Sequence, residues 1–533
     1  MALISTLSLA SWRRQLLAAL LCAGCALLVS SVALAQQDDP LVRDFKKQYA
    51  KYKDVASRRE AVLCLKGEEG AEVVEAIVPL LKEPEPVVVD AVIEVLSGFT
   101  SEDSKLALAL ALEKAGANEQ KAGLLQATRN GKYKVPTKTL HALAGDSNWG
   151  IRRYALQALA VCYPEAADGT HDKLAAACKD SEPAVRAEAL DQLTKFKSPL
   201  VVPPAIALLG DDVWQVRLAA IRGLRTVRRT ESVAPLVARM QIEEGRLVEE
   251  MALALRNLTG REFGMDPPMW KQFLAEEGPG YQIPTEEGLK FLLGKRDLST
   301  GKSSWKVENP QVGAVFGGIE TSSRSIIFII DQSGSMEAEV VERERYKDRG
   351  YPSMMRIDIV KTELQRTIER LEPNVNFNIL AFATELNPWK KNLVAANLIN
   401  KTAAREWVGR LEAIGGNSKS DLVEAGLGGA ANISAGKTNT YGALMWSLNA
   451  MGPRTKDPFT KNYQIAADTV FFLSDGRPTV GDFVEPDDIL REFLEANELR
   501  QVTLHTLAIG EFEKDFMKSL AEKSNGVFVD LGH

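Results

Sequence analysis

Three oxygen-bearing side chains alternate directly after a short apolar run. The run Ser325–Ile330 reads Ser-Ile-Ile-Phe-Ile-Ile, and Asp331, Ser333 and Ser335 follow it. Side chains at alternate positions of an extended segment point the same way, so one carboxylate and two hydroxyls can converge. Oxygen ligands of this kind suit a hard divalent cation. The three residues therefore predict one part of a cation site.

The apolar run has the features of a buried strand that positions these oxygens. Its six residues are too few for a typical helix, and its Ile and Phe content favours a strand covered on both faces. Gly334 predicts a tight turn directly afterwards. Because ligands of open α/β sheets bind at the carboxyl ends of strands, the polar residues stand where a site is expected.

Two later segments supply further oxygens. Gly436-Lys437-Thr438-Asn439 opens a helical pattern, and the apolar run Thr469–Leu473 ends in Ser474-Asp475-Gly476. Each segment would bring one more oxygen to the same edge of the sheet. Asp-x-Ser-x-Ser alone should occur by chance in about one chain in ten of this length. The prediction therefore depends on all three segments together.

These segments resemble the metal-ion-dependent adhesion site of von Willebrand factor type A domains. That site uses Asp-x-Ser-x-Ser, a distant Thr and a distant Asp. All five positions are filled here, by Asp331, Ser333, Ser335, Thr438 and Asp475. The resemblance covers roughly residues 313–533. It implies that the two serines and the threonine ligate directly, whereas the aspartates often act through bound water.

The resemblance also implies a binding function. Near-octahedral oxygen coordination favours Mg²⁺, with Mn²⁺ or Ca²⁺ as substitutes. A neutral hydroxyl shell leaves the ion electrophilic, so an open sixth position should recruit an Asp or Glu carboxylate from a partner protein. Two carboxylates about 4 Å apart repel by roughly 4 kcal/mol at an effective dielectric of 20, and a divalent cation removes that repulsion.

Strands alternate with amphipathic helices in the C-terminal part, 312–533. An edge strand is expected at Val312–Ile319. The other expected strands are Ser325–Ile330, Asn376–Phe382, Thr469–Leu473, Val502–Ile509 and Val527–Asp530. Apolar stripes predict helices over Ile357–Leu371 and Leu444–Met451, and Pro486 suits the start of a third. This alternation predicts an α/β doubly wound, Rossmann-like domain with a mostly parallel sheet.

The region 36–260 is Leu- and Ala-rich and carries a recurring phrase in which an Arg follows an Asp by six residues. The copies are Asp146/Arg152, Asp180/Arg186 and Asp211/Arg217, with fainter copies at Glu83–Leu96 and Glu244–Leu258. A period in the thirties with two helices per unit indicates an all-α solenoid. The phrase resembles short HEAT repeats. We expect five helical hairpins, with Asp capping the second helix and Arg reaching the next repeat's carboxylate.

Other residues of the solenoid leave alternatives open. Trp149 and Trp214 lie three positions before the repeat arginines and serve either inter-repeat packing or an aromatic ligand platform. Cys162 and Cys178 are either buried thiols, as expected for Cys64, or one disulfide. The HEAT repeats would offer a second protein-binding surface.

The N-terminus predicts export. Residues 1–35 contain Arg13 and Arg14, an apolar run and Ala33-Leu34-Ala35, which is typical of a secretory signal peptide. The alternatives are a retained N-terminal anchor or a lipoprotein at Cys25. Because no later stretch approaches about 18 apolar residues, we expect no membrane span in the mature chain. The protein would then be periplasmic, extracellular or at the cell surface.

The remaining composition is that of an ordinary globular protein. The chain has 533 residues, is 45% hydrophobic and carries a formal charge of −6, so nucleic acid is a poor partner. Residues 261–311 are rich in Gly and Pro and predict a linker region with short helices at Pro268–Glu276 and Thr285–Leu293.

An enzyme is the competing class. Haloacid-dehalogenase phosphatases place an acid two residues after the nucleophile, where this chain has Ser333, and no Gly-x-Ser-x-Gly frame for a serine hydrolase surrounds either serine. His505 is expected to pack within its strand. We therefore predict no enzymatic activity. A structural scaffold with a non-functional metal site is the main alternative, and a metal-dependent hydrolase is the other. Ser474–Gly481 also resembles a phrase of the inter-α-trypsin inhibitor heavy chains.

Overall fold

A computed structural model describes most of the chain outside the N-terminus and several internal stretches. The described residues are 40–165, 169–278, 280–294, 314–341, 343–347, 349–414, 436–449, 465–510 and 514–531. The chain divides into two compact units, Met1–Leu140 and His141–His533. The expected leader, most of the predicted linker beyond Leu293 and the Gly-rich stretch before Gly436 lie outside the described residues.

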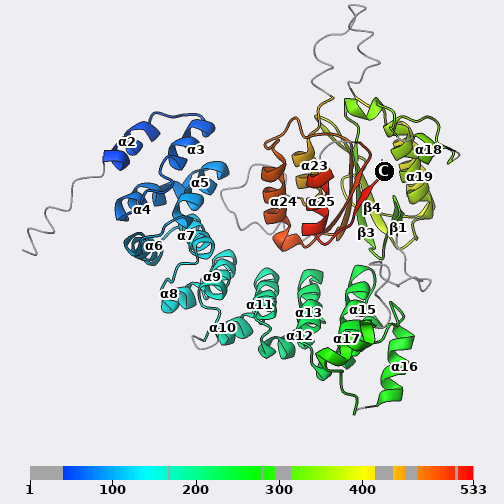
Figure 1. Cartoon of the computed structure of the whole chain (residues 1–533), viewed down its shortest axis with the longest axis horizontal. Coiled ribbons are helices and arrows are strands. Elements are labelled where there is room, and N and C mark those ends of the chain that lie inside the picture. The colour runs from blue at the N-terminus through cyan, green and yellow to red at the C-terminus, as the bar shows by residue number, and fades with distance from the viewer. Residues whose placement is uncertain are drawn as a thin grey trace, which may run out of the picture. The chain divides into compact units, whose positions relative to one another are not determined.

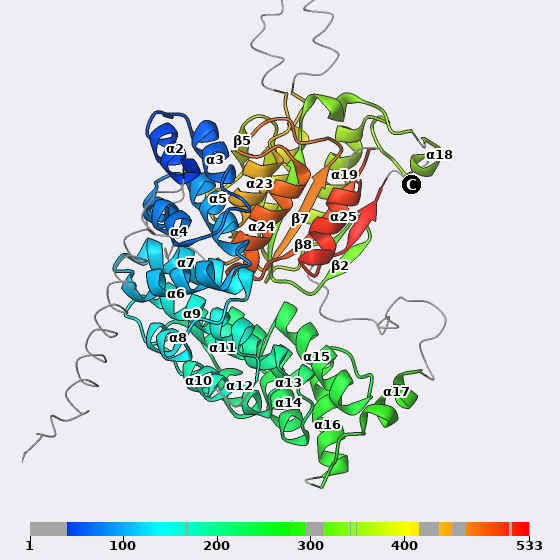
Figure 2. The same ribbon diagram turned by 60° about the vertical axis from the view of Figure 1, so that its left-hand side comes forward.

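Helices fill the solenoid region, as predicted. The first unit contains α2 (Pro40–Tyr49), α3 (Val55–Leu63), α4 (Ala71–Ile77), η1 (Val78–Lys82), α5 (Pro86–Ser97), α6 (Glu102–Lys114) and α7 (Asn118–Gly131), and α8 (Thr137–Leu143) follows at the boundary. The second unit continues with α9 (Trp149–Cys162), α10 (Thr170–Ala177), α11 (Pro183–Lys195), η3 (Pro199–Val201), α12 (Val202–Leu208), α13 (Trp214–Thr226), η4 (Thr230–Ser232), α14 (Val233–Met240) and α15 (Arg246–Thr259). Within the second unit, α9, α11, α13 and α15 contact one another in succession (Figure 2).

The recurring phrase builds the predicted ladder of ion pairs. Arg152 Nη2 donates to Asp180 Oδ1 at 2.6 Å, and Arg186 Nε donates to Asp211 Oδ2 at 2.8 Å. Arg217 Nε continues the ladder to Glu243 Oε2 at 3.0 Å. Each arginine thus reaches the next repeat.

The prediction that the repeat aspartates cap the second helix is wrong, because they bond to the turn before it. Asp180 Oδ1 accepts from the backbone N–H of Glu182, which is the N-cap of α11, at 2.9 Å. Asp211 Oδ1 likewise accepts from Val213 N–H at 2.9 Å. The aspartate therefore stands two residues before the cap and fixes the turn, because an Asx side chain bonds readily to the backbone two residues on.

Two short helices precede the α/β domain, α16 (Pro267–Glu277) and α17 (Glu286–Gly294), close to the predicted bounds. The prediction of a single edge strand at Val312–Ile319 is wrong. Residues from 314 form a hairpin of β1 (Ala314–Phe316) and β2 (Ile319–Thr321). Gly317 and Gly318 have φ of 57° and 84°, so two glycines in the left-handed region reverse the chain.

Seven strands form the main sheet of the described α/β domain. They are β3 (Ser325–Asp331), β4 (Asn376–Phe382), β5 (Leu386–Pro388), β6 (Val394–Ala395), β7 (Thr469–Ser474), β8 (Thr503–Ala508) and β9 (Phe528–Asp530). Their order is β5-β4-β3-β7-β8-β9, with β6 paired to β4. The four pairings that join β4, β3, β7, β8 and β9 are parallel. Strand β3 lies between β4 and β7, so the chain passes from β3 to its neighbour on one side and later returns to pair on the other side. The carboxyl end of β3 is therefore a topological switch point of the sheet.

Helices cover both faces of this sheet. On one face, α19 (Arg356–Arg370) and α20 (Leu398–Gly409) pack against the alternate residues Ile326, Phe328 and Ile330 of β3. On the other, α23 (Thr440–Ser447), α24 (Pro486–Arg500) and α25 (Lys514–Lys523) pack against Ile327 and Ile329 (Figure 1). This is the predicted doubly wound arrangement. The short α18 (Arg343–Tyr346) lies in the segment after β3.

The solenoid part of the second unit contacts the amino end of the sheet. Arg246 of α15 donates to the backbone oxygens of Asp468, just before β7, and Gln501, just before β8, at 3.1 and 2.7 Å. Arg153 of α9 pairs with Glu498 near the end of α24 at 2.8 Å. Trp214 Nε1 faces Ile465 O at 3.4 Å. The guanidinium of Arg246 lies over the Trp214 ring, 5.7 Å from its centroid, so Trp214 packs at this junction.

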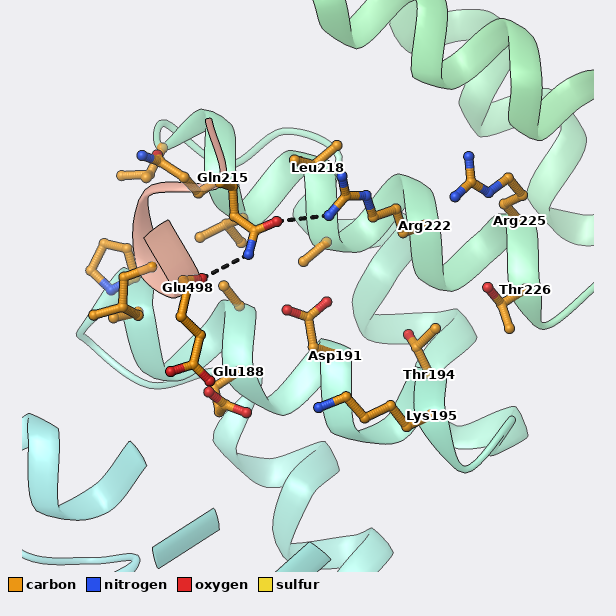
Figure 3. Close-up of a pocket in the computed structure, with 18 residues that line it drawn as sticks. Glu188, Asp191, Thr194, Lys195, Gln215, Leu218, Arg222, Arg225, Thr226 and Glu498 are labelled. Atoms are coloured by element: carbon orange, nitrogen blue, oxygen red, sulfur yellow. Dashed lines mark hydrogen bonds between the residues drawn. The ribbon is translucent and has the colours of Figure 1, made fainter. Parts of the chain in front are cut away.

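A cavity of about 380 Å³ lies at the same junction. Helices α11 and α13 line it together with the end of α24, and Asp191 points into it beside Lys195 and Arg222 (Figure 3). Burial raises the pKa of Asp191 to about 6, and the neighbouring Glu188 carboxylate adds to this effect.

Within the described residues, Cys64, Cys162 and Cys178 form no disulfide. Cys162 and Cys178 are buried, and burial raises the pKa of each thiol to about 12, whereas Cys64 is exposed, contrary to the expectation for it. The possible Cys162–Cys178 disulfide is not formed. No helix within the described ranges has the length and apolar character needed to cross a bilayer.

Candidate metal centre

Three segments meet at the carboxyl end of the sheet. Asp331 ends β3, and a tight turn then carries Ser333 and Ser335 into the short helix η5 (Gly334–Glu337). Asp475 follows directly after β7, the strand beside β3. Thr438 lies two residues before α23. The parallel register of β3 and β7 is what places both aspartates at one edge.

Hydrogen bonds join four of the five predicted residues directly. Ser333 N–H donates to Asp331 Oδ1 at 2.8 Å, and the hydroxyls of Ser333 and Ser335 lie 3.1 Å apart. Ser335 Oγ donates to Asp475 Oδ1 at 2.7 Å. The side chains of a motif near residue 331 and of a motif near residue 475 thus form one network.

The fifth residue, Thr438, is held by its backbone. Its N–H donates to Thr479 Oγ1 at 2.9 Å, and Thr479 N–H returns a bond to Thr438 O at 3.0 Å. Gly334 N–H donates to Gly436 O at 3.1 Å, which joins the turn after β3 to the segment that carries Thr438.

The loop at Gly476 leaves a small volume that three of the predicted oxygens face. A Cβ placed on Gly476 would lie 3.3 Å from Ser335 Oγ, 3.4 Å from Thr438 Oγ1 and 4.0 Å from Asp331 Oδ2. Any side chain at this position would occupy that volume. The glycine therefore keeps open a cradle bounded by two hydroxyls and one carboxylate.

The surroundings of Asp331 disfavour the ionised form of its carboxyl group. Burial, and next the charge of Asp475, raise the pKa of Asp331 from 3.8 to about 7, although Ser333 and Ser474 donate hydrogen bonds to its carboxylate. Ser474 Oγ donates to Asp331 Oδ2 at 2.5 Å. Removing water from a carboxylate and placing a second one nearby both disfavour its ionised form.

Arg356 also belongs to the site and was missed in the sequence. It begins α19, and its Nη1 donates to Asp475 Oδ2 at 2.6 Å. The Arg356 side chain is 10% exposed and the Asp475 side chain 0%. Ser474, the other missed residue, stood beside a predicted ligand, whereas Arg356 lies in a separate segment.

The donor set fits a hard divalent cation. Two carboxylates and three hydroxyls offer only oxygen, and the cradle beside Gly476 is faced by three of these groups. Asp331, Ser333, Thr438 and Asp475 are buried, while Ser335 is exposed and opens the site to solvent. Within the described residues, no three His, Cys, Asp or Glu side chains gather closely enough to hold a metal, and the candidate centre depends on hydroxyl oxygens as well as carboxylates.

His505 has a packing role, as expected. Its Nδ1 accepts from Val527 N–H at 3.1 Å, and its ring stacks on Phe471 with centroids 4.9 Å apart. Burial lowers the pKa of this imidazole to about 4. It lies mid-strand in β8, away from the carboxyl edge where the candidate ligands gather.

Two protein families match parts of this sequence. The sequence matches the von Willebrand factor type A domain family over residues 324–425 and 429–530, and the HEAT repeat family over residues 171–256. Among solved structures, a von Willebrand factor type A protein from Catenulispora acidiphila is 19% identical with a TM-score of 0.27, covering 40% of this chain and 39% of that one.

Curated relatives are inter-alpha-trypsin inhibitor heavy chains. Heavy chain H4 of Homo sapiens is 22% identical over 275 residues, which are 51% of this chain and 25% of that protein. Heavy chain H4 of Bos taurus is 22% identical over 62% of this chain and 34% of its own length. The chain thus spans a quarter to a third of the length of these two relatives. The protein contains a von Willebrand factor type A domain preceded by HEAT-like repeats.

Proposed function

We propose that this chain is an exported binding protein whose type A domain holds a divalent cation and captures a partner's carboxylate through it. The observation that supports this most is the cradle beside Gly476, which Ser335, Thr438 and Asp331 face with oxygen atoms. Mg²⁺, or Mn²⁺ or Ca²⁺ in its place, would supply a Lewis-acidic point of attachment for one further oxygen. This function is binding and involves no turnover.

The hydrogen bonds support a division of roles among the five residues. Ser333, Ser335 and Thr438 would hold the cation directly. Asp475 already accepts from Ser335 Oγ and from Arg356, and Asp331 accepts from Ser333 N–H and Ser474 Oγ. Because their oxygens are engaged in this way, the aspartates would act mainly behind the hydroxyls, as charge and as acceptors for bound water.

The surroundings suit an acidic partner. Lys437 precedes Thr438 and is exposed. Arg477 follows Gly476 with a side chain that is 60% exposed and that lies 3.8 Å from the similarly exposed carboxylate of Glu485. Positive charge around a binding site raises the association rate of a negatively charged partner. We propose a protein ligand that presents Asp or Glu to the cation.

The remaining assignments are also proposals. We assign 1–35 to a signal peptide, 36–260 to the HEAT-like solenoid, 261–311 to a linker region and 312–533 to the type A domain. The relatives are named heavy chains of an inhibitor, and such a name suits a component of a protein assembly. A second protein surface on the repeats would use residues outside the junction with the type A domain.

A structural scaffold is the second candidate, and one contact favours it. Arg356 already neutralises Asp475 at 2.6 Å, so that the site has an internal cation of its own. In this alternative the domain would need no metal, and the repeats would carry the interaction.

Calorimetric titration of the full chain with Mg²⁺ and Mn²⁺ distinguishes the two candidates. We expect one cation per chain, loss of binding in Asp331→Ala, and retained binding in Asp468→Ala, which removes a buried carboxylate at the opposite edge of the sheet. Peptides that contain Asp should bind in Mg²⁺ and not in EDTA, and their Asn counterparts should bind in neither. A folded protein that binds no cation would support the scaffold.

A further inference from the structure

The guanidinium of Arg356 is built into the candidate metal centre. It is buried beside a fully buried carboxylate, and its Nη1 donates to Asp475 Oδ2 at 2.6 Å. The other oxygen of the same carboxylate accepts from Ser335 Oγ at 2.7 Å. Arg356 therefore fixes the Asp475 carboxylate in the orientation in which it accepts a hydrogen bond from Ser335 Oγ. The lone pairs of that hydroxyl then remain available to a cation.

The local structure makes room for this side chain. A Cβ on Gly510, two residues after the end of β8, would lie 3.3 Å from Arg356 Nη1 and 2.8 Å from Asp475 O. Arg356 N–H is also bonded to Ala338 O at 2.9 Å, which ties the start of α19 to the segment after η5. Arg356 Nε is buried without a hydrogen-bond partner in the described structure. The desolvation of this group is therefore only partly compensated, as expected where a charge serves a site.

The charges of the three buried groups have opposing consequences. When both carboxylates are ionised, as they must be to hold a cation, Asp331 and Asp475 carry two negative charges, and Arg356 carries one positive charge. The site thus attracts a divalent cation less strongly than the two aspartates alone would. Once a cation is bound, however, the three side chains and the ion together carry one net positive charge, where they would carry none without Arg356.

We infer that Arg356 is a positioning residue that weakens cation binding and strengthens the attraction of the cation-loaded site for a partner's carboxylate. The inference rests on the proposed function and concerns the regulation of the same site. A unit charge and a divalent ion about 6 Å apart interact strongly enough, even at the dielectric of water, to change a dissociation constant about tenfold. The effect on cation affinity and the effect on anion affinity should therefore be opposite in sign.

Electron paramagnetic resonance of Mn²⁺ with the full chain tests the first effect. Arg356→Gln keeps a hydrogen-bond donor and removes the charge, and it should bind Mn²⁺ at least about tenfold more tightly than wild type. Arg356→Lys keeps the charge and should remain within about threefold of wild type. Arg366→Gln, on the same helix and paired with Glu363, is the matched control and should leave the affinity unchanged.

Acetate is the probe for the second effect. It should displace water from bound Mn²⁺, measured as a fall in solvent proton relaxation, at a concentration several-fold higher in Arg356→Gln than in wild type. A purely structural role would weaken the binding of the cation and of acetate together. The Mn²⁺ affinity and the acetate affinity together therefore distinguish an effect of the Arg356 charge from a distortion of the site.

A charge-matched variant keeps the test decisive if Arg356→Gln does not fold. Asp475→Asn combined with Arg356→Gln has the same net charge as wild type. It should bind Mn²⁺ about tenfold more tightly than Asp475→Asn alone, because both variants lack the Asp475 carboxylate and only the single variant keeps the guanidinium charge. Equal or weaker Mn²⁺ binding by folded Arg356→Gln, or no recovery in the double variant, would overturn the inference alone. A wild-type chain that binds no Mn²⁺ would instead overturn the proposed function, and this inference with it.

Discussion

At the residue scale, the candidate centre is a set of groups that hold one another in place. Both oxygens of Asp331 and both oxygens of Asp475 accept hydrogen bonds from defined donors. Such networks keep a site open because a ligand-bearing side chain cannot rotate without leaving a buried group unpaired. The cation would then bind oxygens that are already oriented.

Filling the volume beside Gly476 should abolish cation binding with little effect on the stability of the protein. In Gly476→Ala the added methyl would lie 3.3 Å from Ser335 Oγ and 3.4 Å from Thr438 Oγ1, where the cation is expected. We expect cation binding to be lost while the free energy of unfolding changes by less than about 1 kcal/mol. Calorimetric titration and chemical denaturation measure the two quantities. Gly210→Ala, whose Cβ meets only Ala207 O at 3.9 Å, is the control.

The raised pKa of Asp331 predicts a pH dependence. Because this pKa is about 7 in the folded protein and 3.8 without its surroundings, the contribution of Asp331 to the stability of the cation-free protein is fully present below about pH 4 and is lost as the pH rises through 7. Mg²⁺ should reverse this loss above pH 7 and have little effect near pH 5. Melting temperatures across this range, with and without Mg²⁺, measure the effect. An identical pH profile in Asp331→Asn would contradict the assignment.

The sequence predicts the five ligand positions because their residue types and order are specific. Arg356 could not be found in this way, since it lies 21 positions after Ser335 at the start of an amphipathic helix. One signal was available. Arg356 lies four residues before Val360, which places a charged residue on the apolar stripe of α19. A charge on a buried stripe indicates a buried partner.

At the scale of elements, long apolar runs are predicted well and short or unusual elements are not. Strands β3, β4 and β7 were predicted within one residue because Ile-, Phe- and Val-rich runs end at polar residues. Strands β5 and β6 have three and two residues, too few for a periodic signal. Helix α20 begins with Leu398 and Ile399, which are 81% and 80% exposed, so its apolar residues do not mark the buried face.

The repeat ladder should contribute strongly to the stability of the solenoid. The Arg186 and Asp211 side chains are 16% and 6% exposed, so Asp211→Ala leaves a largely buried guanidinium unpaired. We expect a loss of about 3 kcal/mol in the free energy of unfolding. Glu60→Ala removes an exposed pair, with Arg59 and Glu60 at 43% and 68%, and should cost less than about 0.5 kcal/mol. Urea denaturation followed by circular dichroism compares the two, and equal losses would contradict the ladder.

At the scale of the whole molecule, the solenoid helices of the second unit and the type A domain share a polar junction. The acceptors for Arg246 are backbone oxygens 222 and 255 positions away in sequence. Backbone oxygens have no sequence signature, which is why the junction was not predicted. It lies at the amino ends of β7 and β8, whereas the candidate metal centre lies at their carboxyl ends, so the contacts leave the centre accessible.

Loss of one junction residue should loosen the amino ends of the strands. Arg246→Met leaves the backbone oxygens of Asp468 and Gln501 without their donor, so we expect amide exchange in the segments before β7 and β8 to accelerate about tenfold or more. Exchange in β4 should be unchanged. Hydrogen–deuterium exchange with mass spectrometry measures both. Arg256 lies on the same helix α15 and pairs with Glu262, which follows the helix; Arg256→Met is the control and should leave these segments unaffected.

The central claim is that Asp331, Ser333, Ser335, Thr438 and Asp475 hold one divalent cation. Anomalous diffraction from crystals of the full chain grown with Mn²⁺ tests it most directly, because the method shows the position of the ion itself. The account predicts one strong Mn²⁺ peak within about 2.5 Å of the hydroxyl oxygens of Ser333, Ser335 and Thr438, absent in Asp331→Ala. An empty site in crystals that hold Mn²⁺ elsewhere, or a peak that remains in Asp331→Ala, would contradict it.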